Sequence, residues 1–83
     1  MDKQYIVPVI GQTYTNRSGG EYLCIGNKDY KNEEGMQRAL SLGEHWSSLK
    51  RVKDGWTLIA HGVIQYVDGT IEWNYSTGGH FLY

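Results

Sequence analysis

The stretch HGVIQYVDGTIEWNYSTGGH, residues 61–80, decides the fold that we expect for this chain. Two runs rich in β-branched and aromatic residues flank Asp68-Gly69. This dipeptide is typical of a two-residue turn in which both residues have positive φ. Such a turn would place Gly62 opposite Tyr75, so the stretch predicts a β-hairpin with a defined register.

Side chains alternate between the two faces of a strand, so this pairing predicts two sets of residues. On the core face, Gly62 would leave room for the ring of Tyr75 to lie across the strand. The core-face set is Leu58, Ala60, Gly62, Ile64, Tyr66, Ile71, Trp73 and Tyr75. The opposite set is Ile59, His61, Val63, Gln65, Val67, Thr70, Glu72, Asn74 and Ser76. Because this second set is mixed, we expect another element or a partner to cover part of it.

The first third of the chain predicts further strands. Pro8 cannot donate to a ladder, which places residues 4–10 at the edge or the start of a sheet. Residues 12–16 and 21–26 flank the four-residue connection 17–20, whose glycines can take positive φ. We expect a first hairpin there.

The middle of the chain has a helical pattern. Asn32 is a suitable N-cap, apolar residues follow at helical spacing, and Gly43 is a suitable C′ residue, so we predict a helix over 33–42. Residues 44–53 fit either a second helix or a strand that enters a hairpin at Asp54-Gly55. Periodicity leaves both possibilities open.

Length and composition indicate one small domain over residues 1–83 with a single core. Apolar residues make up 40% of the chain, and three Trp, seven Tyr and one Phe supply much of their area. We predict an α+β, mainly β fold, either a small antiparallel sheet or a partly open SH3-like barrel with one short helix near 33–42.

The charge balance argues against a domain that gains its affinity from phosphates, because eight Lys and Arg face nine Asp and Glu. The one basic cluster is Lys50, Arg51 and Lys53, close to Trp46 and Trp56. Basic side chains among aromatics can bind single-stranded nucleic acid, so a nucleic-acid-binding barrel is kept as an alternative hypothesis.

Cys24 is the single cysteine, so no intrachain disulfide can form, and a reducing cytoplasm is expected. In an apolar strand its thiol is expected to be buried and inert. We expect no signal peptide and no membrane segment, because the apolar run near the start is too short for either. His45, His61 and His80 lack the spacing of a metal motif, so no metal and no cofactor are expected.

The expected register would also place His61 beside Ser76. A Ser–His hydrolase needs a carboxylate to orient the histidine, and Glu72 would lie roughly 13 Å from Ser76 along the strand. A cross-strand hydrogen bond is therefore favoured. A small hydrolase or nucleotide-processing enzyme that uses His61 or His80 with Glu72 remains the alternative.

The segment STGGH, residues 76–80, has two hydroxyls and two glycine N–H groups that can converge on an anion. It lacks the lysine and the following helix of a phosphate-binding loop. We favour a Gly78-Gly79 turn that leads into a last short strand.

Two stretches resemble known proteins. GQTYTNRSGGEYLCI, residues 11–25, resembles the first hairpin of SH3-like barrels. DGWTLIAHGVIQYVDGTIEWNYSTGGH, residues 54–80, resembles a group of uncharacterised small proteins from Firmicutes and from their phages and mobile elements. That resemblance implies an accessory protein that binds a host protein or captures a ligand.

These observations favour a non-enzymatic binding module with a protein or small-ligand partner. The candidate binding residues are His61, Gln65, Glu72, Asn74, Ser76, Gly78, Gly79 and His80. A homo-oligomer is also possible, because residues 81–83 could add to the sheet edge of a partner.

Overall fold

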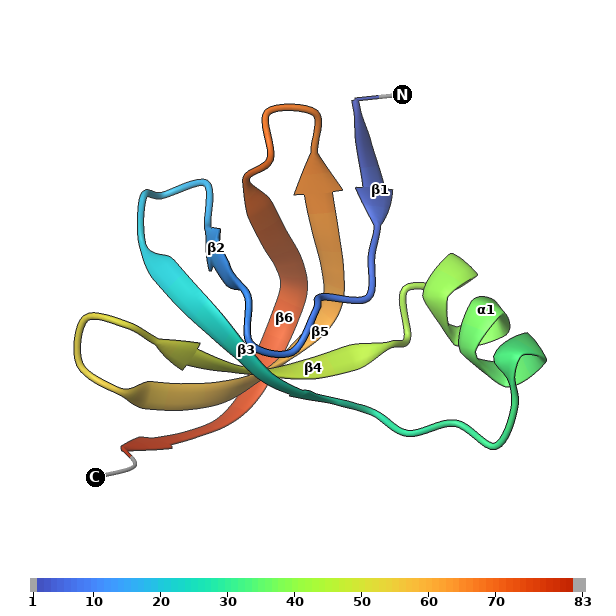
Figure 1. Ribbon diagram of the computed structural model, residues 1–83. Helices are drawn as coiled ribbons and strands as arrows, with labels where there is room; N and C mark the ends of the chain where they lie inside the picture. The colour runs from blue at the N-terminus through green and yellow to red at the C-terminus, as the bar shows by residue number, and fades with distance from the viewer. Residues whose placement is uncertain (1, 82–83) are drawn as a thin grey trace.

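A computed structural model, which describes residues 2–81 and the side chains of 2–79, contains six strands and one helix (Figure 1). The elements are β1 (Lys3–Tyr5), β2 (Thr13–Thr15), β3 (Glu21–Asn27), α1 (Glu33–Ser41), β4 (Trp46–Arg51), β5 (Trp56–Tyr66) and β6 (Ile71–Phe81). All strands pair antiparallel in one sheet. The mainly β, antiparallel prediction is confirmed.

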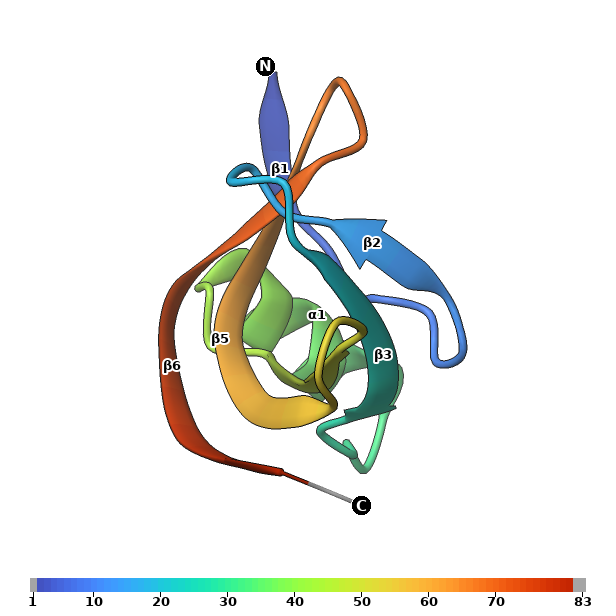
Figure 2. The ribbon, with the colours of Figure 1, turned by 90° about the vertical axis from the view of Figure 1, so that its left-hand side faces the viewer.

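Strand β5 lies at the centre of the sheet because it pairs with three strands. The sheet order is β1-β5-β4-β3-β2, and β6 pairs with the other edge of β5. Figure 2 shows how the sheet curls so that β6 and β3 lie on opposite sides. The sheet is not closed, but the backbone N–H of Arg17, after β2, donates to the carbonyl of Ile71 at 3.1 Å.

Gly62 divides β5 into two parts with different neighbours. Residues 57–61 pair with β4, and residues 64–66 pair with β1. Gly62 has φ of 69°, and its N–H donates to the carbonyl of His45 at 2.8 Å. On either side of it, Ala60 and Val63 are both buried. The positive φ of Gly62 therefore breaks the regular alternation of side chains between the two faces of β5.

The predicted two-residue turn at Asp68-Gly69 is wrong. The N–H of Tyr66 donates to the carbonyl of Thr70, and the N–H of Gly69 donates to the carbonyl of Tyr66, both at 2.9 Å. The loop therefore has three residues, 67–69. Gly69 has φ of 91°, but no described non-glycine residue has positive φ. Asp68 instead accepts hydrogen bonds from the N–H and hydroxyl of Thr70, at 3.0 and 2.6 Å.

The longer loop shifts the predicted register by one residue. His61 faces Tyr75, and Ala60 rather than His61 faces Ser76. Val63, expected on the mixed face, is only 1% exposed, whereas Tyr75, expected in the core, is 58% exposed. The predicted division of the hairpin into a polar face and an aromatic face is therefore also wrong.

The first hairpin is confirmed, but its loop has three residues, 17–19, instead of the predicted four. The N–H of Asn16 donates to the carbonyl of Gly20 at 2.8 Å, and the N–H of Gly19 donates to the carbonyl of Asn16 at 2.9 Å. Gly19 has φ of 97°. This hydrogen-bond pattern is the one that also closes the loop at 67–69.

The helix is confirmed, and the ambiguous stretch 44–53 contains strand β4, at Trp46–Arg51, and no second helix. The Asn32 side chain accepts from the N–H of Gly35 at 2.8 Å at the start of α1. At its end Gly43 has φ of 70°, and the N–H of Glu44 donates to the carbonyl of Ala39 at 2.8 Å, as in a Schellman motif. Strand β4 lies between β3 and β5, so alternate β4 side chains enter the core.

The core lies inside the curl of the sheet. Its buried members are Tyr14, Tyr22, Cys24, Leu49, Leu58, Ala60, Val63 and Ile71. Trp73 packs against this cluster, with its ring centroid 5.1 Å from that of Tyr22 in an edge-on arrangement. Cys24 is fully buried as expected, and burial raises the pKa of its thiol. In the part of the chain described, no helix is long and apolar enough to cross a membrane.

Candidate binding surface at β1, β5 and β6

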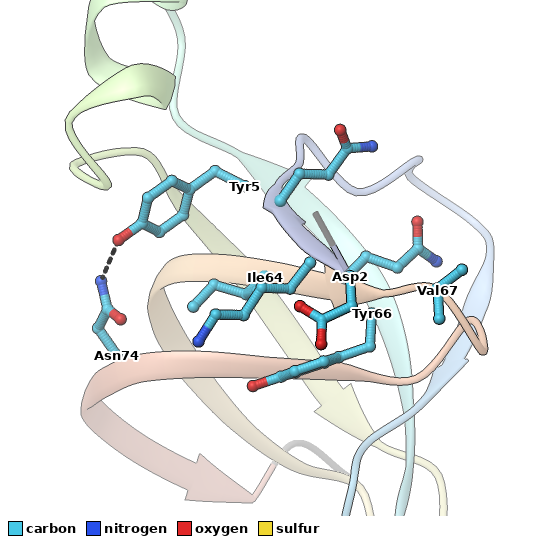
Figure 3. A pocket seen from close by; sticks show the side chains of 9 residues that line it. Asp2, Tyr5, Ile64, Tyr66, Val67 and Asn74 are labelled. Carbon is cyan, nitrogen blue, oxygen red and sulfur yellow. Dashed lines mark hydrogen bonds between the residues drawn. The ribbon is translucent and has the colours of Figure 1, made fainter.

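An open pocket of about 690 Å³ lies where β1 pairs with the end of β5, beside β6 (Figure 3). The pairing places Lys3 opposite Tyr66 and Tyr5 opposite Ile64. Because directly paired residues share a face, these four side chains lie on one side of the sheet. The lining residues are Asp2, Lys3, Gln4, Tyr5, Ile64, Gln65, Tyr66, Val67 and Asn74.

Tyr5 and Asn74 close one end of the pocket. The side-chain amide of Asn74 donates to the hydroxyl of Tyr5 at 3.3 Å (Figure 3). The Tyr5 ring lies so close to Gly43 that a Cβ there would be 2.7 Å from its hydroxyl. A Cβ on Gly62 would clash with the Asn74 amide. Two glycines therefore make space for this tyrosine and this asparagine.

Tyr66 lies at the other end and is held from several sides. Its hydroxyl donates to Oε2 of Glu72 at 2.7 Å, and this carboxylate is the main reason that the pKa of Tyr66 is raised. The guanidinium carbon of Arg17 lies 3.9 Å from the ring centroid, and Nζ of Lys3 lies 5.9 Å from it. Both cations are within reach of a cation–π interaction.

A second hollow of about 430 Å³ adjoins β6 at its start. Its lining residues are Asn16, Arg17, Ser18, Ile71, Glu72 and Trp73. Arg17 and Glu72, which contact the Tyr66 ring and hydroxyl, both belong to it. The two hollows have no lining residue in common, but two residues of the second hollow hold Tyr66, which lines the first.

His61 and Tyr75 form an aromatic stack, which was not predicted because the expected register paired His61 with Ser76. Their rings are parallel within 4°, with centroids 4.4 Å apart. Nε2 of His61 lies 2.9 Å from the hydroxyl oxygen of Thr77, a hydrogen bond that replaces the expected one to Ser76. The alternation of apolar and polar residues does not predict this pair, because the pairing of His61 with Tyr75 requires a loop of three residues.

Among the side chains that the structure describes, the histidine and the glutamate of the catalytic alternative do not lie together. Glu72 accepts its hydrogen bond from Tyr66, whereas His61 contacts Tyr75 and Thr77. Glu72 lies three residues from Tyr75, the partner of His61, which is roughly 10 Å along a strand. The side chain of His80 falls outside the described residues.

The remaining candidates on the hairpin are dispersed. Gln65 faces Gln4 of β1, and its side-chain amide donates to the carbonyl of Gly69 at 3.2 Å. Gln65 and Asn74 are the two candidates that line the larger pocket. Ser76 is exposed opposite Ala60.

The predicted Gly78-Gly79 turn is wrong, because β6 continues through both glycines to Phe81. Thr57 pairs with His80 and Ile59 with Thr77, so two residues of β6 lie opposite one residue of β5. This is a β-bulge. A Cβ on Gly79 would lie 2.6 Å from the ring of Trp56, which therefore covers this glycine.

The predicted basic cluster does not form one surface. Arg51 donates through Nε and Nη2 to both carboxylate oxygens of Asp54, at 2.9 and 2.7 Å. This pair raises the pKa of Arg51 and lowers the pKa of Asp54 to about 2. Lys50 and Arg51 are consecutive in β4 and so point to opposite faces, while Lys53 lies in the loop.

A buried polar network around His45 was not predicted. His45 is 2% exposed, with Nε2 3.0 Å from Oδ1 of Asn27 and Nδ1 2.7 Å from the hydroxyl of Tyr30. The Asn27 amide nitrogen donates to the carbonyl of Pro8, so its oxygen accepts from His45 and from Ser47. Nε2 therefore carries the proton, and Nδ1 accepts from Tyr30.

Burial is the main reason that the pKa of His45 is lowered, and the nearby Lys28 lowers it further. The neutral ring satisfies the groups around it, which indicates a structural histidine. Within the described chain, no group of three His, Cys, Asp or Glu could hold a metal ion.

Comparison of the chain with protein-family models, with curated proteins and with solved structures finds no match.

Proposed function

We propose that this chain is a non-enzymatic binding module whose partner inserts a polar group into the pocket between Tyr5 and Tyr66. The observation that carries the proposal is the pocket of about 690 Å³ with a hydrogen-bonded tyrosine at each end. Its volume falls within the range of about 300–1,000 Å³ that is usual for small-ligand sites. A small molecule or a side chain of a protein partner would fit.

Preorganisation supports binding here. Tyr5 is held by Gly43 and Asn74, and Tyr66 by Glu72 and Arg17. Side chains that are already ordered lose less conformational entropy when a ligand arrives. Tyrosines also offer both apolar area and a hydroxyl, and they are common in recognition surfaces.

The composition of the pocket favours binding over catalysis. Its described lining includes no histidine, cysteine or serine. Asparagine, two glutamines and two tyrosines supply uncharged donors and acceptors around the apolar side chain of Ile64. Asp2 and Lys3 add one charge of each sign, so the lining has no net charge. A neutral hydrogen-bonding ligand with a flat or aliphatic part is the class that fits this lining.

The curled sheet supports a finer assignment of the fold, to an α+β, partly open SH3-like barrel. The contact between Arg17 and Ile71 brings the end of β2 to the start of β6, as closure of a small barrel would require. A role as an accessory protein of a phage or mobile element is part of the same proposal, supported by the likeness of residues 54–80.

A fragment library screened by NMR would test the pocket. We expect fragments with amide or hydroxyl groups to shift the resonances of Tyr5, Ile64 and Asn74, and Tyr66→Ala to abolish their binding. Val52→Ala, an exposed apolar residue between β4 and β5, is the matched control and should bind as the parent does.

Thermal unfolding of each variant separates loss of binding from loss of structure. If a folded Tyr66→Ala protein bound the fragments as tightly as the parent, or if the shifts mapped only to other surfaces, the pocket assignment would be wrong.

A further inference from the structure

The second hollow, of about 430 Å³, is lined by one residue of each charge. Arg17 lies in the loop between β2 and β3, and Glu72 lies near the start of β6. Both side chains are exposed, so a ligand can reach them. The volume falls within the range of about 300–1,000 Å³ that is usual for small-ligand sites. A small ligand in this hollow would therefore meet a positive and a negative group together.

Arg17 and Glu72 do not neutralise each other. Among the residues that the structure describes, Arg51 and Asp54 form the only ion pair. Both Arg17 and Glu72 contact Tyr66 instead. The guanidinium carbon of Arg17 lies 3.9 Å from the centroid of the Tyr66 ring, and Oε2 of Glu72 accepts from the Tyr66 hydroxyl at 2.7 Å. Tyr66 therefore holds the two charges apart, one over its ring and one beyond its hydroxyl.

The contacts with Tyr66 position both charged groups without using all of their hydrogen-bonding capacity. A guanidinium has its N–H donors in its plane, so a ring against its face leaves them available to a carboxylate. Within the described chain, no hydrogen bond from the Arg17 guanidinium is found. Oε1 of Glu72 has no described partner either, and it can accept from an ammonium group.

The other residues of the hollow are already engaged. Oδ1 of Asn16 accepts from the Ser18 hydroxyl and from the N–H of Gly20, both at 2.9 Å. The Trp73 ring packs edge-on against Tyr22, with centroids 5.1 Å apart, and supplies an apolar wall. The two charged residues are therefore the groups that would recognise a polar ligand, and the indole would contact its apolar part.

We propose that the second hollow binds a free α-amino acid with an aromatic or aliphatic side chain. At neutral pH such a molecule carries a carboxylate and an ammonium group on one carbon atom. The carboxylate would accept from Arg17, the ammonium would donate to Glu72, and the side chain would lie against Trp73. A ligand with a single charge is less suited, because one of the two residues attracts it and the other repels it.

One more charged residue influences this choice. Hydrogen bonds from Thr70 are the main reason that the pKa of Asp68 is lowered, and the charge of Arg17 lowers it further. Asp68 does not line the hollow, and its Oδ1 accepts from the N–H and hydroxyl of Thr70. Its negative charge near Arg17 disfavours a ligand that is only an anion.

The amino-acid site is separate from the pocket between Tyr5 and Tyr66, because the two sets of lining residues have no member in common. The two ligands also differ in chemistry, since a neutral molecule is proposed for the pocket and a doubly charged one for the hollow. Either proposal can therefore fail without the other.

An NMR titration with three matched ligands tests the amino-acid site. The ligands are L-phenylalanine, phenethylamine, which lacks the carboxylate, and phenylpropionate, which lacks the ammonium. We expect L-phenylalanine to shift the resonances of Arg17, Ser18 and Trp73 with a dissociation constant of about 1 mM or lower. Each analogue should bind about 10-fold more weakly, because it lacks one hydrogen bond between charged groups.

Two substitutions assign the charges to their residues. Arg17→Gln should weaken the binding of L-phenylalanine about 10-fold, whereas Arg38→Gln, at an exposed arginine of α1, is the matched control and should not. Glu72→Gln keeps an oxygen that can accept from Tyr66 but removes the negative charge. It should therefore bind phenylpropionate more tightly than the parent does, a gain that unfolding cannot produce.

Four results would overturn the proposal. The first is the absence of shifts at the hollow with L-phenylalanine up to about 10 mM. The second is binding of phenylpropionate as tight as that of L-phenylalanine, and the third is an equal effect of Arg17→Gln and Arg38→Gln. The fourth is binding of a peptide of alternating glutamate and lysine without binding of L-phenylalanine, which would assign the two charges to a protein partner.

Discussion

Glycines with positive φ serve two different purposes in this chain. At Gly69 the left-handed conformation closes a loop, and a Cβ would meet no atom within 4 Å. At Gly62 a Cβ would also meet the carbonyl oxygen of Gly43 at 2.9 Å and the amide of Asn74. Conformation and close approach therefore both require glycine at position 62.

Gly62→Ala should consequently cost more than Gly69→Ala, although both glycines have similar φ. We expect about 1 kcal/mol for Gly69→Ala, from the left-handed conformation alone, and about 3 kcal/mol or more for Gly62→Ala. Urea unfolding of the two variants measures the difference directly. Equal losses would mean that the sheet near Asn74 relaxes without cost.

At the scale of elements, helix α1 depends on its ends. Its sequence has two acidic residues in the first turn, but only Ala39 is buried, so packing holds it weakly. The Asn32 cap and the Schellman motif at Gly43 therefore supply a large share of its stability.

Removing the cap tests this dependence. Asn32→Ala should lower the free energy of unfolding by about 1 kcal/mol, because the N–H of Gly35 loses its acceptor, while Asn32→Asp should retain most of it. Chemical denaturation gives both values, and Lys31→Ala is the neighbouring control. A cap variant as stable as the parent would show that tertiary contacts hold the helix start.

The caps also explain which elements were predictable. Asn32 and Gly43 act within a few residues of themselves, so local sequence located α1 almost to the residue. The dipeptide Asp68-Gly69 located the second hairpin but not its loop length, since Asp-Gly suits two-residue and three-residue loops. One extra loop residue then moved every side chain of β6 relative to β5.

The candidate site was less predictable because it depends on contacts between distant segments. Gln65, Glu72 and Asn74 were identified, but Tyr5, Lys3 and the bonds that fix them were not. No local pattern indicates that Tyr5 meets Asn74 or that Arg17 covers Tyr66. Those contacts follow from β1 and β6 both pairing with β5.

At the scale of the whole molecule, the network of His45 joins β3, β4 and the segment before α1. Burial lowers the pKa of His45 below its ordinary value near 6.5, so the unfolded chain binds a proton more readily than the folded chain. The stability that this group contributes is therefore complete above about pH 6.5 and is lost as the pH falls below that value.

Urea unfolding between pH 8 and pH 5 should show this loss, with a slope of up to about 1.4 kcal/mol per pH unit from one group. His45→Gln should be less stable at pH 8 but should lack that part of the slope. His61→Gln, at a half-exposed site, is the control and should keep it. If the free energy of unfolding of His45→Gln fell with pH as steeply as that of the parent, groups other than His45 would cause the slope.

The position of β5 also determines when the chain can fold. Its partners β1 and β6 come from opposite ends of the chain, with Lys3 paired to Tyr66 and Trp56 paired to Phe81. During synthesis β1 therefore has no strand to pair with until the ribosome has released β5, and β5 lacks one neighbour until β6 emerges. Such non-local pairing slows folding, because the chain loses the entropy of loop closure before the strand contacts can stabilise it. The sheet is thus completed only after nearly all of its residues have left the exit tunnel.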